Sequence, residues 1–164
     1  MTAHMLEHMA LTLILGPALA AGARVRLRIP AAVALVQFGL VVAVLHVPVV
    51  WNAVHERPLL QVCADVLTLA SAALFWWPAL SVASPLGPIG RTAYLMVGMP
   101  LMSLPGVVLD FVDHPLYRGV SVSQQHRGGA LMWGGGSALS AAVLVAAVWG
   151  SLVREERDVA GAGA

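Results

Sequence analysis

The chain contains 164 residues, of which 59% are hydrophobic and only 10% are charged. Soluble domains carry about a quarter charged residues, so this composition excludes an ordinary soluble globule. The mean hydropathy of +0.84 also excludes a disordered chain. A net charge of +1 provides no basic surface for nucleic acid, and the single cysteine, Cys63, excludes an internal disulfide. We therefore expect an integral membrane protein whose surroundings are the lipid bilayer.

Five stretches are long and apolar enough to cross a bilayer, which takes about 20 residues in a helix. They are residues 4–22, 30–51, 58–80, 92–112 and 128–153. None of them alternates apolar and polar residues as the strands of a membrane barrel do. We predict an all-α, polytopic membrane helix bundle of about five transmembrane helices. Residues 1–158 are expected to form a single domain, and residues 159–164 a flexible tail.

The arginines predict the orientation of the chain, because cytoplasmic loops carry an excess of positive charge. The N-terminus is expected outside and the C-terminus inside, since this arrangement places six arginines inside and three outside. The inner group is Arg24, Arg26, Arg28, Arg91, Arg154 and Arg157, and the outer group is Arg57, Arg118 and Arg127.

The first span has a second interpretation as a signal peptide, because Ala18, Ala20 and Gly22 follow a leucine-rich core. A signal peptide carries positive residues before its core. Here Glu7 precedes the core and the arginines follow it. We therefore expect a retained helix.

Small and aromatic residues predict packing features. A run of small residues in the last span favours close helix packing, and it comprises Gly134, Gly135, Gly136, Ser137, Ser140 and Ala141. Tryptophans near predicted helix ends are more typical of an interfacial belt than of a cofactor cage. The tryptophans are Trp51, Trp76, Trp77, Trp133 and Trp149.

All six histidines are predicted at or beyond the outer membrane boundary. They are His4, His8, His46, His55, His114 and His126. Most acidic residues before the C-terminal tail lie at the same level, namely Glu7, Glu56, Asp110 and Asp113. Asp65 lies deeper, about two turns into the third span. Because ionisable groups at membrane depth are costly, they normally pair with each other or with a ligand.

Helical spacing groups several of these side chains into a candidate metal site. His4, Glu7 and His8 share one helix face, and Met5 and Met9 form its neighbour. Imidazole with thioether suits copper, especially Cu(I), whereas imidazole with carboxylate also suits zinc or iron. The alternative is that interfacial histidines sit at headgroup level and that both methionines are ordinary apolar residues. Six histidines on one side favour a functional site.

Several stretches, in this order, resemble the multi-spanning bacterial CtaG proteins, which take part in assembling caa-type cytochrome c oxidase. They are residues 4–9 (HMLEHM), 15–17 (LGP), 45–48 (LHVP), 75–78 (FWWP) and 128–133 (GGALMW). The resemblance implies a maturation factor for a copper-containing terminal oxidase in the bacterial cytoplasmic (inner) membrane, with oxidase subunits as partners.

The resemblance matches His4, His8 and His46 to histidines of the family. Gln61 and Asp65 stand where relatives carry histidines. Many relatives have further spans before the His-Met motif, so the chain is expected to be either a naturally short or a truncated member.

The leading hypothesis is a non-enzymatic assembly factor that binds copper at the outer face. Its best candidate ligands are His4, His8 and His46. Further candidates are Met5, Met9, His55 and His114, and the carboxylates expected to orient ligands are Glu7, Asp65 and Asp110. Two alternatives stay open: a haem- or iron-binding membrane redox protein, and a metal-free scaffold for oxidase subunits. No nucleophile with a base or phosphate-binding loop is evident, and homo-oligomerisation stays open.

Overall fold

The computed structural model describes residues 1–23, 27, 29–138, 141–142, 144–146, 148–150 and 153. Every regular element within these ranges is helical, which confirms the all-α prediction. The predictions for the tail and for five of the nine arginines fall outside the described residues. Those arginines are Arg24, Arg26, Arg28, Arg154 and Arg157.

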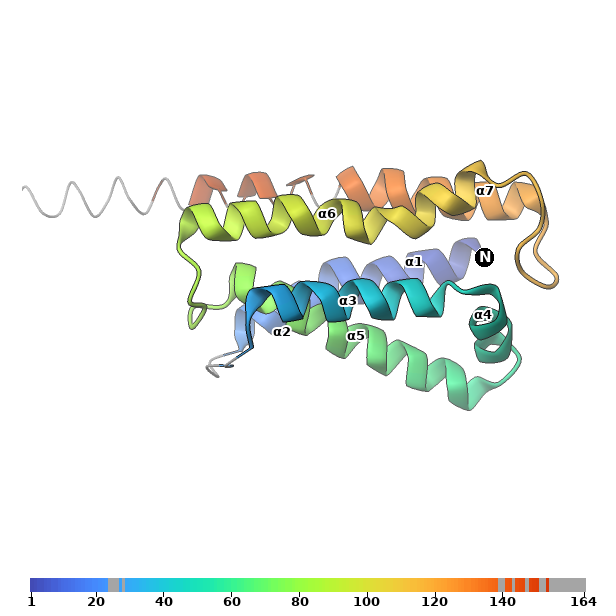
Figure 1. Cartoon of the computed structure of the whole chain (residues 1–164), viewed down its shortest axis with the longest axis horizontal. Coiled ribbons are helices and arrows are strands. Elements are labelled where there is room, and N and C mark those ends of the chain that lie inside the picture. The colour runs from blue at the N-terminus through green and yellow to red at the C-terminus, as the bar shows by residue number, and fades with distance from the viewer. Residues whose placement is uncertain are drawn as a thin grey trace, which may run out of the picture.

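The long helical rods run antiparallel to one another, and the short α4 lies at an angle at one end (Figure 1). In chain order they are α1 (Thr2–Ala10), the π-helical segment η1 (Leu11–Leu15), α2 (Gly16–Gly22), α3 (Ala31–Leu45), α4 (Pro48–His55), α5 (Pro58–Leu80), α6 (Pro88–Phe111), α7 (Val122–Ala130) and the π-helical segment η2 (Leu131–Gly135). The first three form one continuous rod, Thr2–Gly22, of 21 residues. Beyond η2, the described residues up to 153 are also helical.

Three helices in the described part of the chain are long and apolar enough to cross a membrane: Thr2–Gly22, Pro58–Leu80 and Pro88–Phe111. A fourth span results if α3 and α4 are counted together, although they are bent by 72°. The structure therefore provides three or four candidate spans where the sequence predicted about five. The predicted fifth span, 128–153, includes residues that are not described.

The predicted span over residues 30–51 is not one continuous helix, because the helix breaks between α3 and α4. Pro48 disfavours helical geometry at the residue before it, and Val47 is extended, with φ −64° and ψ 129°. Pro48 then occupies the first turn of α4, where its missing N–H is harmless. The break turns α4 across the end of the bundle.

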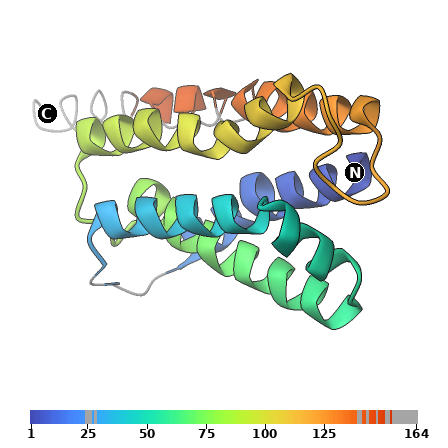
Figure 2. The same ribbon diagram turned by 45° about the vertical axis from the view of Figure 1, so that its right-hand side comes forward.

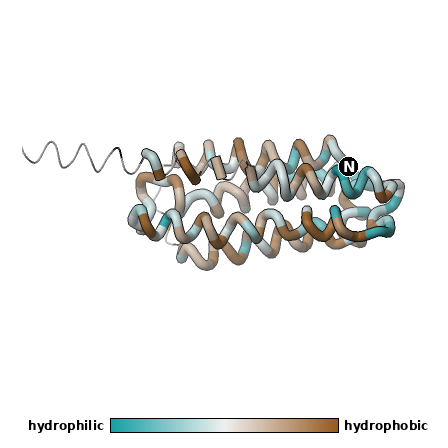
Figure 3. The backbone as a smooth tube through the Cα atoms, turned by 90° about the horizontal axis from the view of Figure 1, so that it is seen from above, coloured by the Kyte–Doolittle hydropathy of each residue, from teal (hydrophilic) through white to brown (hydrophobic). Residues whose placement is uncertain are grey.

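The N-terminus, α4 and the loop between α6 and α7 lie at the same end of the bundle in two views (Figures 1 and 2). Hydrophilic residues gather near that end, whereas apolar residues follow the length of the helices (Figure 3). Large apolar side chains such as Leu40, Val66 and Val97 are exposed on the outside of the helices. This distribution is typical of a bundle that faces lipid.

Three tryptophans are buried inside the protein, so the interfacial-belt prediction is wrong for Trp51, Trp76 and Trp77. The indole N–H of Trp76 donates to the carbonyl oxygen of Thr12 at 2.6 Å. An indole is stable in an apolar core when its N–H finds such an acceptor. Trp133 and Trp149 retain substantial exposure.

A close helix crossing joins α6 and α7 at two glycines, Gly106 and Gly129. A Cβ atom added at Gly129 would lie 2.6 Å from the carbonyl oxygen of Gly106. The predicted small-residue interface is wrong at Gly134 and Gly136, where an added Cβ would meet no atom of the described residues within 4 Å. Close packing therefore occurs earlier in the last helix than expected.

Candidate functional site

Five of the predicted ligand residues surround one small cavity at the α4 end of the bundle. They are His4 and His8 from α1, His46 from the α3–α4 junction, His55 from α4 and Asp65 from α5. We call this space the histidine cavity. Its volume is about 20 Å³, which is enough for an ion or a water molecule.

The helix break and the spacing along α1 bring the imidazole rings together. His4 and His8 are four residues apart and share a face of α1, with ring centroids 6.4 Å apart. The bend at Pro48 carries His55 to within 4.7 Å of His4. At the other side of the cavity the His46 ring lies 5.5 Å from that of His8. The four rings therefore form a row in the order His55, His4, His8 and His46.

Backbone hydrogen bonds fix the tautomer of two of these rings. The Nδ1–H of His46 donates to the carbonyl oxygen of Val42 at 2.7 Å, and the Nδ1–H of His55 donates to that of Trp51 at 2.9 Å. A carbonyl oxygen only accepts, so in each neutral ring the lone pair lies on Nε2. Metal-binding histidines are commonly held in this way through the nitrogen that does not bind the metal.

Two buried ring nitrogens at the cavity have no hydrogen-bond partner among the described residues. They are Nδ1 of His4 and Nε2 of His46. His46 is only 9% exposed, so water provides little compensation. Because an unpaired buried polar atom is unfavourable, these two nitrogens are suited to a bound ligand.

Trp51 supports the row of histidines from α4. Its ring stacks on His55 at 4.0 Å and on Tyr117 at 4.6 Å, and the His4 ring meets it edge-on at 4.4 Å. Tyr117 donates its hydroxyl proton to the carbonyl oxygen of His46 at 2.9 Å. Burial raises the pKa of Tyr117 to about 12, so this donor stays protonated at neutral pH.

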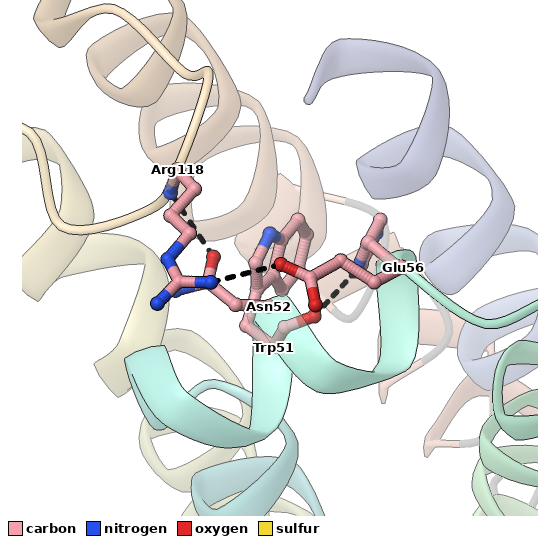
Figure 4. A network of polar contacts seen from close by, with 5 residues as sticks. Trp51, Asn52, Glu56 and Arg118 are labelled. Carbon is pink, nitrogen blue, oxygen red and sulfur yellow. Dashed lines mark hydrogen bonds and ion pairs between the residues drawn. The ribbon is translucent and has the colours of Figure 1, made fainter.

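The loop between α6 and α7 fastens α4 from the outside (Figure 4). The backbone N–H of Arg118 donates to Oδ1 of Asn52 at 3.0 Å, and its Nη1 pairs with Oε1 of Glu56 at 3.1 Å. Both charged side chains are largely exposed, so the ion pair contributes little stability. The contact instead fixes where the loop meets α4.

Gln125 holds the other side of this loop. Its side chain is fully buried, accepts from the backbone N–H of Leu116 at 2.9 Å and donates to the carbonyl oxygen of Val112 at 3.0 Å. The loop, and with it Tyr117, is therefore anchored on α7. These contacts connect α7, through the loop and Tyr117, to Trp51 and the histidine cavity.

The other five predicted ligand residues do not line the histidine cavity. Met5 is fully buried in the core, and Glu7 and His114 are exposed. Met9 lines a different cavity. Asp110 accepts a hydrogen bond from Nε1 of Trp133 at 2.8 Å. The face predicted for His4, Glu7 and His8 is thus divided, because the two rings turn inward while Glu7 stays outside.

The geometry limits what the cavity holds. Among the described His, Cys, Asp and Glu side chains, no group of three is positioned to hold a metal ion as it stands. An ion shared by several imidazoles therefore requires the rings to rotate toward the cavity.

Trp51 is an aromatic lining residue that the sequence interpretation did not assign to the site. The available signal was its position four residues before His55, which places both on one face of a short helix. Thr68 of α5 also lines the cavity.

A family model described as cytochrome c oxidase caa3 assembly factor (Caa3_CtaG) matches residues 1–154. No match was found among curated proteins or solved structures. The matched residues include every residue of the histidine cavity and confirm the resemblance seen in the sequence. The chain therefore belongs to the family of cytochrome c oxidase caa3 assembly factors.

Proposed function

We propose that this chain binds Cu(I) at the histidine cavity and assists copper delivery or insertion during oxidase assembly. The role is non-catalytic, and the partners are oxidase subunits. The observation that carries the proposal is the buried Nε2 of His46, which lacks a partner while its Nδ1 is tied to the backbone. This arrangement presents a lone pair to the cavity.

The ligand chemistry favours copper over a purely structural role for the histidines. Four imidazoles converge on a small space between helices, and His8 and His46 are almost fully buried. Burying polar groups is costly unless they are paired. A bound ion compensates this cost, and imidazole is a suitable ligand for copper.

The need for ring rotation suits a metal that is passed on. A rigid, complete cage holds its ion tightly, whereas a site that rearranges on binding pays part of the binding energy for that rearrangement. Asp65 borders the cavity and offers a carboxylate to accept an N–H or to balance the charge of the ion. The cavity thus fits a reversible carrier of copper.

The outer face of the bacterial inner membrane is the proposed location of the histidine end. The arginine distribution supports this orientation, because Arg57, Arg118 and Arg127 are the minority group and belong to the histidine end. In this orientation the histidine cavity lies near the outer face of the membrane. An ion that leaves the cavity there can pass directly to an oxidase subunit in the same membrane.

Replacing His4 and His46 by leucine tests this function in cells that depend on the chain for oxidase assembly. Leucine preserves approximate volume and removes the ring nitrogens. We expect the copper content and activity of the oxidase to fall by about tenfold or more, because ligand loss weakens metal binding at least as much as loss of a supporting residue. Added copper is expected to restore part of the activity.

A matched control is His114→Leu, because His114 is exposed and does not line the cavity. It is expected to leave the oxidase unchanged. If the His4→Leu, His46→Leu double variant supports full copper content while removal of the whole chain abolishes assembly, the chain acts as a metal-free scaffold and the copper proposal is wrong.

A further inference from the structure

A second cavity lies further along the first rod and shares His8 with the histidine cavity. Its volume is also about 20 Å³, and its lining includes Met9, Met102 and Met132 as well as His8. These side chains come from α1, α6 and η2. We call this space the methionine cavity.

Three thioethers border this space although the whole chain has only seven methionines. Methionine often fills irregular gaps in a core. Here the three side chains surround space that stays open. Thioethers are soft ligands that select Cu(I), and His8 adds an imidazole to the same cavity.

Both π-helical segments of the described chain contribute to the lining. Thr12 and Leu13 come from η1, and Met132 comes from η2. Such π-helical turns occur frequently at functional sites. In η2, Gly135 leaves room for the end of Met9, since an added Cβ would lie 3.2 Å from the Met9 methyl carbon.

We propose that the methionine cavity is a second Cu(I) site and that His8 is the residue through which the two cavities exchange the ion. This inference rests on the proposed function, because it takes copper as the metal of the histidine cavity. The ion stays Cu(I) throughout and exchanges imidazole for thioether ligands, so no electron is transferred. The softer ligands and the surrounding apolar residues Phe38 and Val42 protect the reduced ion from water.

The test uses the 164-residue chain purified in detergent with Cys63→Ser as background, so that sulfur bound to copper comes from thioethers. Cys63 is exposed and lines neither cavity. The chain is loaded with Cu(I) in competition with a chromogenic Cu(I) chelator, and X-ray absorption reports the sulfur ligands. We expect two bound Cu(I) per chain and a clear sulfur contribution.

The decisive variant is Met102→Leu with Met132→Leu, because leucine preserves volume at small cost to stability. It is expected to bind one Cu(I) and to lose most of the sulfur contribution. Met96→Leu is the matched control on the same helix, since Met96 is exposed and outside the cavity. The His4→Leu, His46→Leu variant is expected to keep the sulfur-bound ion.

The outcomes separate the two proposals. If the protein with both cavities unmodified binds one Cu(I) and shows no sulfur ligand, the methionine site is wrong and the histidine site still stands. This result does not depend on whether the methionine variants fold, because it is measured on the protein with both cavities unmodified. Absence of any bound copper overturns both. A sulfur contribution that persists undiminished in the double methionine variant also overturns the assignment to Met102 and Met132.

Discussion

Replacing Trp51 with alanine is expected to destabilise the protein and to weaken copper binding together. The side chain is 4% exposed, stacks on His55 and Tyr117 and meets the edge of His4. Truncating a buried tryptophan costs about 3–5 kcal/mol of unfolding free energy, because the surrounding residues only partly fill the space. Unfolding by SDS titration in mixed micelles measures this loss.

The same variant loses the support of two cavity histidines. Without the indole, His4 and His55 regain rotational freedom, and Cu(I) affinity is expected to fall by about tenfold or more. Trp51→Phe keeps an aromatic ring to stack on and is expected to retain most of both properties. Trp149→Ala, at a largely exposed residue, is the control. Unchanged stability and copper affinity in Trp51→Ala would contradict the role assigned to this side chain.

Gly129→Ala is expected to force α6 and α7 apart. The new Cβ would lie 2.6 Å from both the Asp110 backbone nitrogen and the Gly106 carbonyl oxygen. These are backbone atoms that no side-chain rotation removes, so we expect a loss of about 1–3 kcal/mol, the usual cost of overpacking. This loss equals or exceeds the roughly 1 kcal/mol that alanine gains over glycine in a helix.

Gly134→Ala provides the matched comparison in η2. An added Cβ there meets nothing within 4 Å, so the variant is expected to unfold at the same or a higher SDS fraction than the parent protein. If both variants had the same stability, the close α6–α7 crossing would be wrong.

The sequence predicted the features that depend on neighbouring residues along one helix. The apolar run over 58–80 coincides with α5, and the four-residue spacing of His4 and His8 places both rings toward the same cavity. These features follow from hydrophobic length and from the helical repeat, which are properties of a local segment.

The features that failed depend on how the helices pack. The tryptophans were assigned to a belt because only their distance from helix ends was visible, whereas the buried acceptor for Trp76 is contributed by Thr12 of another helix. Likewise, glycine composition did not reveal that Gly129, rather than Gly134, faces Gly106. The contribution of Met102 and Met132 to one cavity also required the helix arrangement.

The most direct test of the central claim is a titration of the purified chain with Cu(I), followed by ¹⁵N NMR of the imidazole rings. The backbone bond at Nδ1 predicts that copper binds the Nε2 of His46, which has no other partner. With the first equivalent of Cu(I), the Nε2 resonance of His46 is therefore expected to shift, while the exposed His114 stays unchanged. Copper that perturbs His114 and leaves His46 unchanged would contradict the account.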